Sequence, residues 1–298
     1  MDAHIGLARA LVPSTVTLQV QIPAEHPSVP TLGEERTGSA VLVEPGILLT
    51  VNYVVMGGRR IEATLSGGRT APAEIVAQDH ESGLAVLSLP IRDTPVAPPG
   101  DSRGLAVGDE VFILGCTGAT ERRVSNGIIT DLGGFDAYWE YQLESAIQLS
   151  AFNPGFGGGP LFTRLGRLVG ITSLNLGQVG RLSLAIPVHL YADHRAELLR
   201  FGRIRGRARR AWLGLFSENG PGGPAVVGVV PASPAARAGI REGDLIQAVN
   251  FRDVATRTEF YQELWKQPAG ATIRLALARE ERRVTVEVPS VDRADFYR

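Results

Sequence analysis

The sequence predicts an all-β first domain of the sandwich or barrel type, followed by a smaller module that combines strands and helices. Short runs of Val, Ile and Leu recur along the first two-thirds of the chain and are separated by Gly and Pro. A run of arginines interrupts this pattern, and beyond it strand-like runs alternate with helix signals. A chain of 298 residues is long enough to bury the cores of two such domains.

The apolar runs of the first part have the length and composition of β-strands. They are Ser39–Val43, Ile47–Val51, Leu84–Leu89, Glu110–Leu114, Gly127–Thr130, Leu168–Ile171 and Leu182–Ile186. The stretch Pro187–Phe201 differs, because its apolar residues recur at mostly helical spacing. We predict a helix there.

The segment 200–210 carries six arginines and is the clearest linker candidate. Like charges repel one another, which favours a solvated connector; binding of an acidic partner or of nucleic acid is the alternative. The predicted organisation follows from this linker. It comprises a β-barrel domain over 1–199, the linker over 200–210, a second module over 211–290 and a C-terminal tail over 291–298.

The second module combines strand-like runs with two helix starts. The runs are Trp212–Phe216, Ala225–Val230, Leu245–Val249, Thr272–Ala278 and Arg283–Val288. Thr256 and Glu259 form a capping-box pattern, after which Phe260 and Leu264 share one helical face. A short helix is also predicted at Pro234–Ala238, with Gly239 as its C-cap.

Charge and cysteine content narrow the classes of function. The formal net charge of −1 does not point to nucleic acid, and a single cysteine, Cys116, excludes an internal disulfide. Residues 1–6 have no basic n-region, and no apolar run is long enough for a membrane span. We therefore expect a cytoplasmic protein, or a periplasmic one if a leader has been removed.

Several segments, in order along the chain, resemble the HtrA (high-temperature-requirement) serine proteases. They are Gly38–Leu42, Gly46–Thr50, Leu84–Leu87, Ser125–Ile129, Asn153–Leu161, Gly166–Ile171 and Leu184–Val188. Together they cover about 11–190. The resemblance implies a trypsin-like (chymotrypsin-type) domain of two packed six-stranded antiparallel β-barrels, with the active site between them.

The C-terminal module resembles a PDZ domain, the peptide-binding module attached to such proteases. Trp212–Leu215 is similar to the carboxylate-binding strand, and Ser233–Ile246 is close to the family's PDZ consensus. The resemblance therefore implies an all-β double barrel followed by an α+β PDZ domain.

The same resemblance indicates a degenerate catalytic triad. Tyr53 stands at the histidine position, Gly83 at the aspartate position and Gly157 at the serine position. Glycine offers neither a nucleophile nor an orienting group, and a phenol is a poor base near neutrality. We therefore expect a pseudoprotease, an inactive homologue of a serine endopeptidase, in which Gly155 and Phe156 remain as a vestigial oxyanion loop.

Other sources of chemistry are weaker. A Cys116–His80 pair would need a reactive thiol, and a lone buried cysteine is usually inert. Asp79, His80 and Glu81 are metal-capable by type, but three adjacent residues of a strand do not converge on one ion. The only lysine, Lys266, lies in the second module. We expect no metal and no cofactor.

The PDZ resemblance implies a groove that accepts an extended C-terminal peptide as an added strand. Its walls would be the strand Trp212–Phe216 and the helix from Thr256 to about Lys266. The expected wall residues, several of which can equally belong to the core, are Trp212, Leu213, Gly214, Leu215, Phe260, Tyr261 and Leu264. Arg209 and Arg210 precede the strand and are placed to attract a carboxylate.

The resemblance implies a bacterial, HtrA-like peptide- or protein-binding or scaffold protein of the quality-control system. The alternatives are a regulatory subunit that co-assembles with an active HtrA-type protease, and a serine endopeptidase with a displaced active site. The expected partners are C-terminal or unfolded peptides through the PDZ domain, and an active HtrA paralogue or further copies of the chain in a trimer-based oligomer. We expect neither nucleic acid nor a membrane span.

Overall fold

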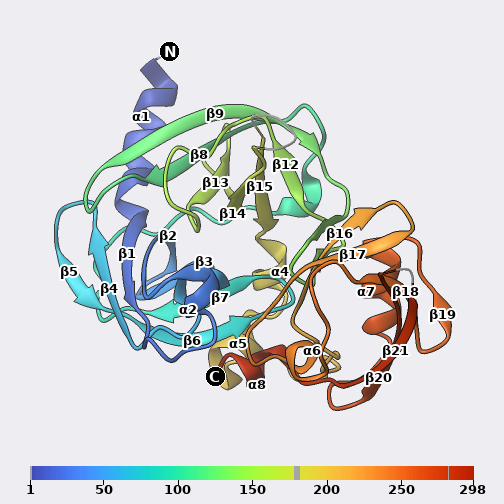
Figure 1. Cartoon of the computed structure of the whole chain (residues 1–298). Coiled ribbons are helices and arrows are strands. Elements are labelled where there is room, and N and C mark those ends of the chain that lie inside the picture. Colours follow the sequence, from blue (N-terminus) through green and yellow to red (C-terminus); the bar gives the residue numbers. More distant parts are fainter. Residues whose placement is uncertain (1, 178–181, 281) are drawn as a thin grey trace. The chain divides into compact units, whose positions relative to one another are not determined.

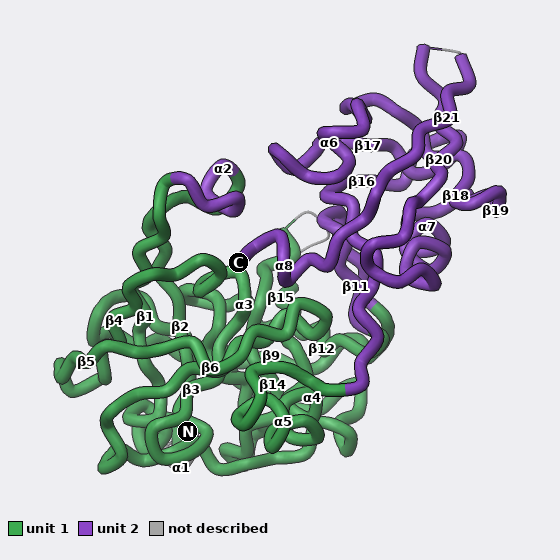
Figure 2. Tube along the Cα trace, turned by 90° about the horizontal axis from the view of Figure 1, so that it is seen from below, with its two compact units in different colours: residues 1–24, 31–134, 144–205 green, residues 25–30, 135–143, 206–298 purple. Residues whose placement is uncertain are grey.

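The computed structural model describes residues 2–177, 182–280 and 282–298 (Figure 1). The chain divides into two compact units, which Figure 2 shows in green and purple. Unit 1 consists of residues 1–24, 31–134 and 144–205, and unit 2 of residues 25–30, 135–143 and 206–298.

Two short segments depart from the predicted organisation. Residues 25–30 and 135–143 belong to unit 2, whereas the prediction assigned them to the first domain. Their contacts are with residues far away in the sequence, as in the hydrogen bond between His26 Nε2 and the Tyr297 carbonyl oxygen (3.0 Å). Contacts between residues so far apart cannot be predicted from a local sequence pattern. The predicted domain boundaries remain a prediction.

Unit 1 contains a seven-stranded antiparallel sheet of order β5-β4-β1-β2-β3-β7-β6, where the resemblance implied six strands. Its strands are rich in β-branched and leucine side chains; Val16, Leu18 and Leu49 are fully buried. The strands are β1 (Thr15–Gln21), β2 (Glu35–Glu44), β3 (Ile47–Val51), β4 (Arg60–Leu65), β5 (Thr70–Pro72), β6 (Glu74–Asp79) and β7 (Leu84–Ser88).

Unit 1 also contains a closed barrel of order β12-β15-β14-β13-β8-β9, which has the six strands that the resemblance implied. Its interior is filled by buried aliphatic residues, among them Ile113, Ile129 and Leu149. The strands are β8 (Glu110–Cys116), β9 (Arg122–Asp131), β12 (Ile147–Leu149), β13 (Pro160–Thr163), β14 (Leu168–Asn175) and β15 (Ser183–Pro187).

The helix predicted over Pro187–Phe201 forms two helices, because the chain leaves helical geometry at His194. These are α4 (His189–Ala192) and α5 (Arg195–Phe201), and α5 ends at Gly202 in the left-handed conformation. The other helices of the chain before this point are α1 (Asp2–Leu11), η1 (Val12–Ser14), α2 (Val29–Leu32), α3 (Asn52–Val55) and η2 (Ser102–Gly104). Across the described ranges, no helix is long and apolar enough to cross a membrane.

Unit 2 is built on an antiparallel sheet of order β16-β17-β18-β20-β21, with β19 paired to β18. The helix α7 begins after Thr256, whose hydroxyl accepts from the Glu259 amide (3.2 Å) as the capping box predicted. The elements are β16 (Leu215–Gly220), β17 (Gly223–Val229), α6 (Pro234–Arg237), β18 (Leu245–Val249), β19 (Arg252–Asp253), α7 (Arg257–Leu264), β20 (Thr272–Arg279), β21 (Arg282–Pro289) and α8 (Arg293–Phe296).

A small hairpin from the middle of the chain completes unit 2. Its strands are β10 (Phe135–Ala137) and β11 (Tyr141–Leu143), joined by a turn at 138–140. In sequence it lies between β9 and β12, two neighbouring strands of the unit 1 barrel. We call residues 135–143 the inserted hairpin.

Candidate functional site

The structure brings together two of the three positions predicted to correspond to a catalytic triad. Tyr53 lies in α3, and its hydroxyl donates to the carbonyl oxygen of Ser173 (2.7 Å). A Cβ atom added to Gly157 would lie 1.9 Å from that hydroxyl oxygen. The tyrosine hydroxyl therefore occupies the space that any side chain at position 157 would need.

The third position, Gly83, also lies against α3. Its carbonyl oxygen accepts from the Asn52 amide (2.7 Å), and its own amide donates to the Asp79 carbonyl oxygen (2.8 Å). Gly83 has a φ of 78°, a backbone conformation that favours glycine. The three positions are thus neighbours in unit 1, and their equivalence to a triad remains a prediction.

The residue types at these positions limit what they can do. Burial raises the pKa of Tyr53 to about 12, so at neutral pH its hydroxyl is a hydrogen-bond donor and a very weak base. Gly157 has no side chain to act as a nucleophile. Any hydrolysis by this unit must take its nucleophile from another residue.

The predicted oxyanion loop already donates to acceptors of the chain itself. The Gly155 amide donates to Asn153 Oδ1 (3.2 Å), and the Phe156 amide to the Cys116 carbonyl oxygen (2.9 Å). These contacts fix the loop but direct both amides toward protein atoms. An oxyanion would compete with these acceptors for both donors.

Cys116 and His80 have different partners. The buried Cys116 thiol donates to the Val16 carbonyl oxygen (3.4 Å), while His80 Nδ1 bonds the Asn52 side-chain amide (3.0 Å). The alternative of a Cys116–His80 nucleophilic pair therefore gains no support from their hydrogen bonds. In the part of the chain that the structure describes, no cluster of His, Cys, Asp and Glu is arranged to hold a metal ion.

In unit 2, the side chains expected to line a peptide groove mostly lie in the hydrophobic core. Leu213, Leu215, Phe260 and Leu264 are all about 1% exposed or less and belong to one buried cluster. The predicted strand Trp212–Phe216 begins only at Leu215, because Gly214 has a φ of 85°. A Cβ on Gly214 would lie 2.3 Å from the Ser233 side chain, so this turn requires glycine.

The main chain, by contrast, presents a row of donors along the outer edge of β16. The amides of Leu213 and Leu215 donate to the two carboxylate oxygens of Glu140, at 3.1 and 2.6 Å. The amide of Ser217 donates to the carbonyl oxygen of Tyr138 (2.7 Å). The amides of Leu215 and Ser217 share one side of β16, because alternate residues of a strand face the same way. The Leu213 amide comes from the turn just before the strand, and all three amides bond residues of one segment, 138–140.

Glu140 is the residue of this site that the sequence reasoning missed. It is 3% exposed, and burial raises the pKa of its carboxyl to about 7, although the amides of Leu215 and Leu213 and the charge of Arg293 act in the opposite direction. The only signal in the sequence is one acidic residue between Trp139 and Tyr141. That pattern is equally typical of a solvated turn.

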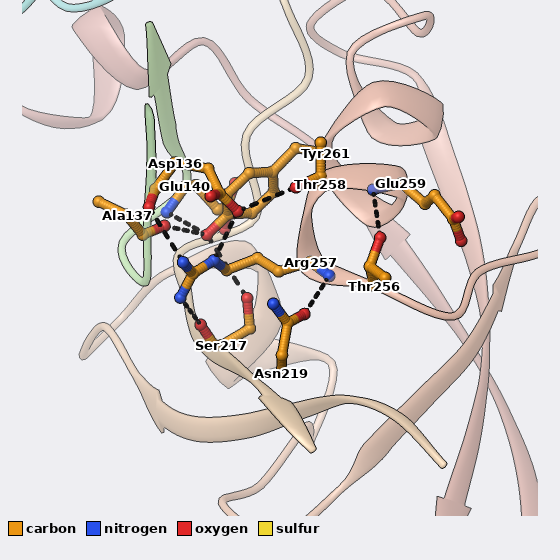
Figure 3. Close-up of polar contacts among 10 residues, drawn as sticks. All are labelled: Asp136, Ala137, Glu140, Ser217, Asn219, Thr256, Arg257, Thr258, Glu259 and Tyr261. Atoms are coloured by element: carbon orange, nitrogen blue, oxygen red, sulfur yellow. Dashed lines mark hydrogen bonds and ion pairs between the residues drawn. The ribbon is translucent and has the colours of Figure 1, made fainter. Parts of the chain in front are cut away.

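The helix α7 also contacts the inserted hairpin (Figure 3). The Tyr261 hydroxyl donates to the Ala137 carbonyl oxygen (2.7 Å) and accepts from the Glu140 amide (2.9 Å). Arg257 forms an ion pair with Asp136 (2.9 Å). Tyr261, although fully buried, is therefore an expected wall residue whose hydroxyl bonds the inserted hairpin.

Trp212 and Arg209 are engaged elsewhere in unit 2. The Trp212 ring packs against Phe296 and Tyr297, with ring centroids 4.7 and 5.6 Å apart. Arg209 pairs with Asp292 and Asp295. A peptide carboxylate would have to compete with these two aspartates for Arg209, and the expectation that Arg209 attracts it remains a prediction.

Comparison with protein families and solved structures now identifies the chain's type. Residues 38–171 match a trypsin-like peptidase domain, and residues 207–289 match a PDZ domain. In both domains the chain is similar to HtrA-type proteases. Its fold is a trypsin-like domain followed by a PDZ domain, as predicted.

Solved HtrA-type structures match nearly the whole chain. The HtrA-type protease AlgW with a tripeptide is 26% identical, with a TM-score of 0.60 and 97% of each chain covered. The serine endoprotease from Yersinia pestis is 27% identical, with a TM-score of 0.58 and 97% of each chain covered.

Curated relatives match over a smaller share of their own length. A probable periplasmic serine endoprotease DegP-like from Hahella chejuensis is 32% identical over 85% of this chain and 57% of its own length. The periplasmic serine endoprotease DegP of Salmonella typhimurium is 30% identical over 84% and 56%. The chain thus spans little more than half the length of these relatives.

Two predictions are wrong in the light of these relatives. The chain was predicted not to be an enzyme, yet proteins about 30% identical over most of it are named serine endoproteases. The residue types at Tyr53, Gly83 and Gly157 limit only what those positions can contribute.

The predicted cytoplasmic location is also contradicted, since the same relatives are named periplasmic. The composition of a short N-terminal segment does not determine a compartment.

Proposed function

We propose that this HtrA-type protein binds extended peptides with a free C-terminal carboxylate through its PDZ domain, in periplasmic protein quality control. The observation that supports the proposal is the contact of the Glu140 carboxylate, through both its oxygens, with the Leu213 and Leu215 amides at 3.1 and 2.6 Å. A peptide terminus presents the same group, and the amide of Ser217 continues the donor row along the edge of β16. Strand addition to a sheet edge uses such a row.

The magnitude of binding follows from these contacts. Hydrogen bonds to a charged group contribute about 1.5–3 kcal/mol each, but an extended peptide loses conformational freedom when it docks. A net affinity near micromolar, about 8 kcal/mol, is expected. The AlgW structure with a tripeptide and the periplasmic names of the curated relatives support the peptide class and the compartment.

The test is fluorescence anisotropy on the full chain with a small library of labelled peptides. Each free-acid peptide is paired with the same peptide carrying a C-terminal amide, which removes the charge and one acceptor oxygen. The free acids should bind about tenfold more tightly than the amides. Equal affinity for both forms would overturn the proposal.

Serine endopeptidase activity is a second candidate function, favoured by the names of the relatives. Because Gly157 has no side chain, the nucleophile would have to be a different residue. Labelling with a fluorophosphonate, followed by mapping of the modified peptide, would identify that serine. Absence of both labelling and cleavage of denatured casein would overturn this candidate.

A further inference from the structure

The carboxylate-binding turn of unit 2 is occupied by a side chain of the same protein. Glu140 forms one hydrogen bond through each carboxylate oxygen, to the amides of Leu213 and Leu215. Gly214, between them, has a φ of 85°, which lets both flanking amides face one anion. A peptide C-terminus would need the same two donors.

The contacts of the inserted hairpin continue along the strand edge. The carbonyl oxygen of Tyr138 accepts from the Ser217 amide (2.7 Å), as the backbone of an added strand would. The Tyr138 ring meets Phe216 edge-on, with centroids 5.6 Å apart. The hairpin thus matches an extended ligand in both its carboxylate and its backbone acceptor.

The helical side of the site is occupied as well (Figure 3). Arg257 bonds the carboxylate and the carbonyl oxygen of Asp136, at 2.9 and 3.0 Å, and the Ser217 carbonyl oxygen at 3.2 Å. Thr258 adds a hydroxyl contact to Asp136 (3.2 Å). Residues of both β16 and α7 therefore hold the hairpin, so a second ligand cannot use these groups at the same time.

We propose that the inserted hairpin, residues 135–143, is a built-in ligand of the PDZ domain and that an external peptide binds only by displacing it. This inference rests on the proposed peptide-binding function. It also defines the chemistry of the competitor, which must offer a carboxylate in place of Glu140. An aromatic residue two positions earlier would replace the contact of Tyr138 with Phe216.

Competition of this kind lowers the apparent affinity for external peptides. When only a fraction of the molecules has an open site, the observed dissociation constant is the intrinsic one divided by that fraction. Weakening the hairpin raises the fraction and tightens peptide binding. A hairpin contact that only stabilised the fold would have the opposite effect or none.

The first test compares hydrogen exchange, followed by mass spectrometry, in full-length wild type and Glu140→Ala. The Leu213 and Leu215 amides should exchange at least about tenfold faster in the variant, because they lose their acceptor. Glu144→Gln, at an exposed glutamate just beyond the hairpin, is the matched control and should leave exchange unchanged. Equal exchange in wild type and Glu140→Ala would overturn the inference.

The second test measures binding of the free-acid peptides to the same proteins by anisotropy. Glu140→Ala should bind about tenfold more tightly than wild type, and Glu144→Gln should bind like wild type. Asp136→Ala loosens the hairpin through Arg257, away from the carboxylate turn, and should act in the same direction if Glu140→Ala folds poorly. Equal affinity of wild type, Glu140→Ala and Asp136→Ala would overturn the inference but leave the proposed function standing. Binding to none of the proteins would overturn the proposed function and the inference together.

Discussion

In each unit, one of the chain's own side chains occupies a position that was predicted to be functional. In unit 1, the Tyr53 hydroxyl occupies the space beside Gly157 and donates to the Ser173 carbonyl oxygen. In unit 2, the Glu140 carboxylate accepts from the amides of Leu213 and Leu215. The two groups differ in chemistry, since one is a phenol and the other a carboxyl, and in the element that carries them, since Tyr53 lies in α3 and Glu140 in the inserted hairpin.

The two groups differ in whether they titrate near neutral pH. The pKa of Tyr53 is raised to about 12 by burial, so the group stays neutral over the physiological range. Glu140 has a pKa of about 7 and lies in the turn of a two-stranded hairpin. We therefore expect the contact of Glu140 to depend on pH near neutrality and the contact of Tyr53 to be independent of it.

The largest effect is expected from Leu215→Asp in unit 2. The Leu215 side chain is 1% exposed and belongs to the core, so the substitution buries an unpaired charge. Unit 2 should lose about 3–5 kcal/mol of stability and unfold, while unit 1 stays folded. Thermal unfolding followed by circular dichroism measures this, with Leu215→Met as the volume-conserving control. A full-length Leu215→Asp protein with a wild-type melting curve would contradict the assignment of this side chain to the core.

A smaller effect is expected from pH, acting through Glu140. Its folded pKa of about 7 lies above its ordinary value of 4.5, so between these values the folded protein holds a proton that the unfolded chain releases. The contribution of Glu140 to stability should therefore be fully present below about pH 4.5 and fall by up to roughly 3 kcal/mol as pH rises through 7. The charged group facing Glu140 is Arg293 of α8, and Tyr261 of α7 stays neutral because burial raises its pKa.

Urea unfolding at pH 5 and pH 8 isolates this effect when wild type is compared with Glu140→Gln. The amide side chain keeps the shape but cannot titrate, so the variant should lose the part of the pH dependence that belongs to residue 140. Parallel pH profiles for the two proteins would show that Glu140 keeps the same pKa in the folded and unfolded states.

The smallest effect is expected from Gly157→Ala in unit 1. The new Cβ would lie 1.9 Å from the Tyr53 hydroxyl oxygen, and the overpacking should cost about 1–3 kcal/mol. Tyr53→Phe removes that oxygen and alone should cost about 1 kcal/mol for the lost hydrogen bond. In the double variant the two costs should be less than additive, as a double-mutant cycle of urea unfolding would show. Strict additivity would mean that the two groups do not share this space.

Local chemistry explains which parts of the fold the sequence could predict. The strand at Ile47–Val51 and the N-cap at Thr256 were predicted correctly, because an apolar run and a capping box are both patterns of residues close together in the sequence. The break between α4 and α5 and the late start of β16 at Leu215 were missed. Both depend on backbone conformations, at His194 and Gly214, that side-chain periodicity does not reveal.

The site in unit 2 was predictable only in part, for a related reason. The resemblance indicated a strand at Trp212–Phe216 and the capping box indicated a helix after Thr256, and residues of both segments contact the inserted hairpin. The partner of that turn, Glu140, lies 73 residues before Leu213 in the sequence. Nothing near Glu140 distinguishes a buried carboxylate from a solvated one, because the difference is made entirely by packing.

The covalent continuity of the inserted hairpin with β9 and β12 has a further consequence. A ligand carried on its own chain is present at an effective concentration that is typically millimolar for short flexible connections, and dilution does not lower it. Hairpin contacts that would give only weak binding between separate molecules are then sufficient to occupy the amides of Leu213, Leu215 and Ser217. If the hairpin is the built-in ligand proposed above, a free peptide must compete with this constant local concentration, and only peptide termini present at high concentration would occupy the site.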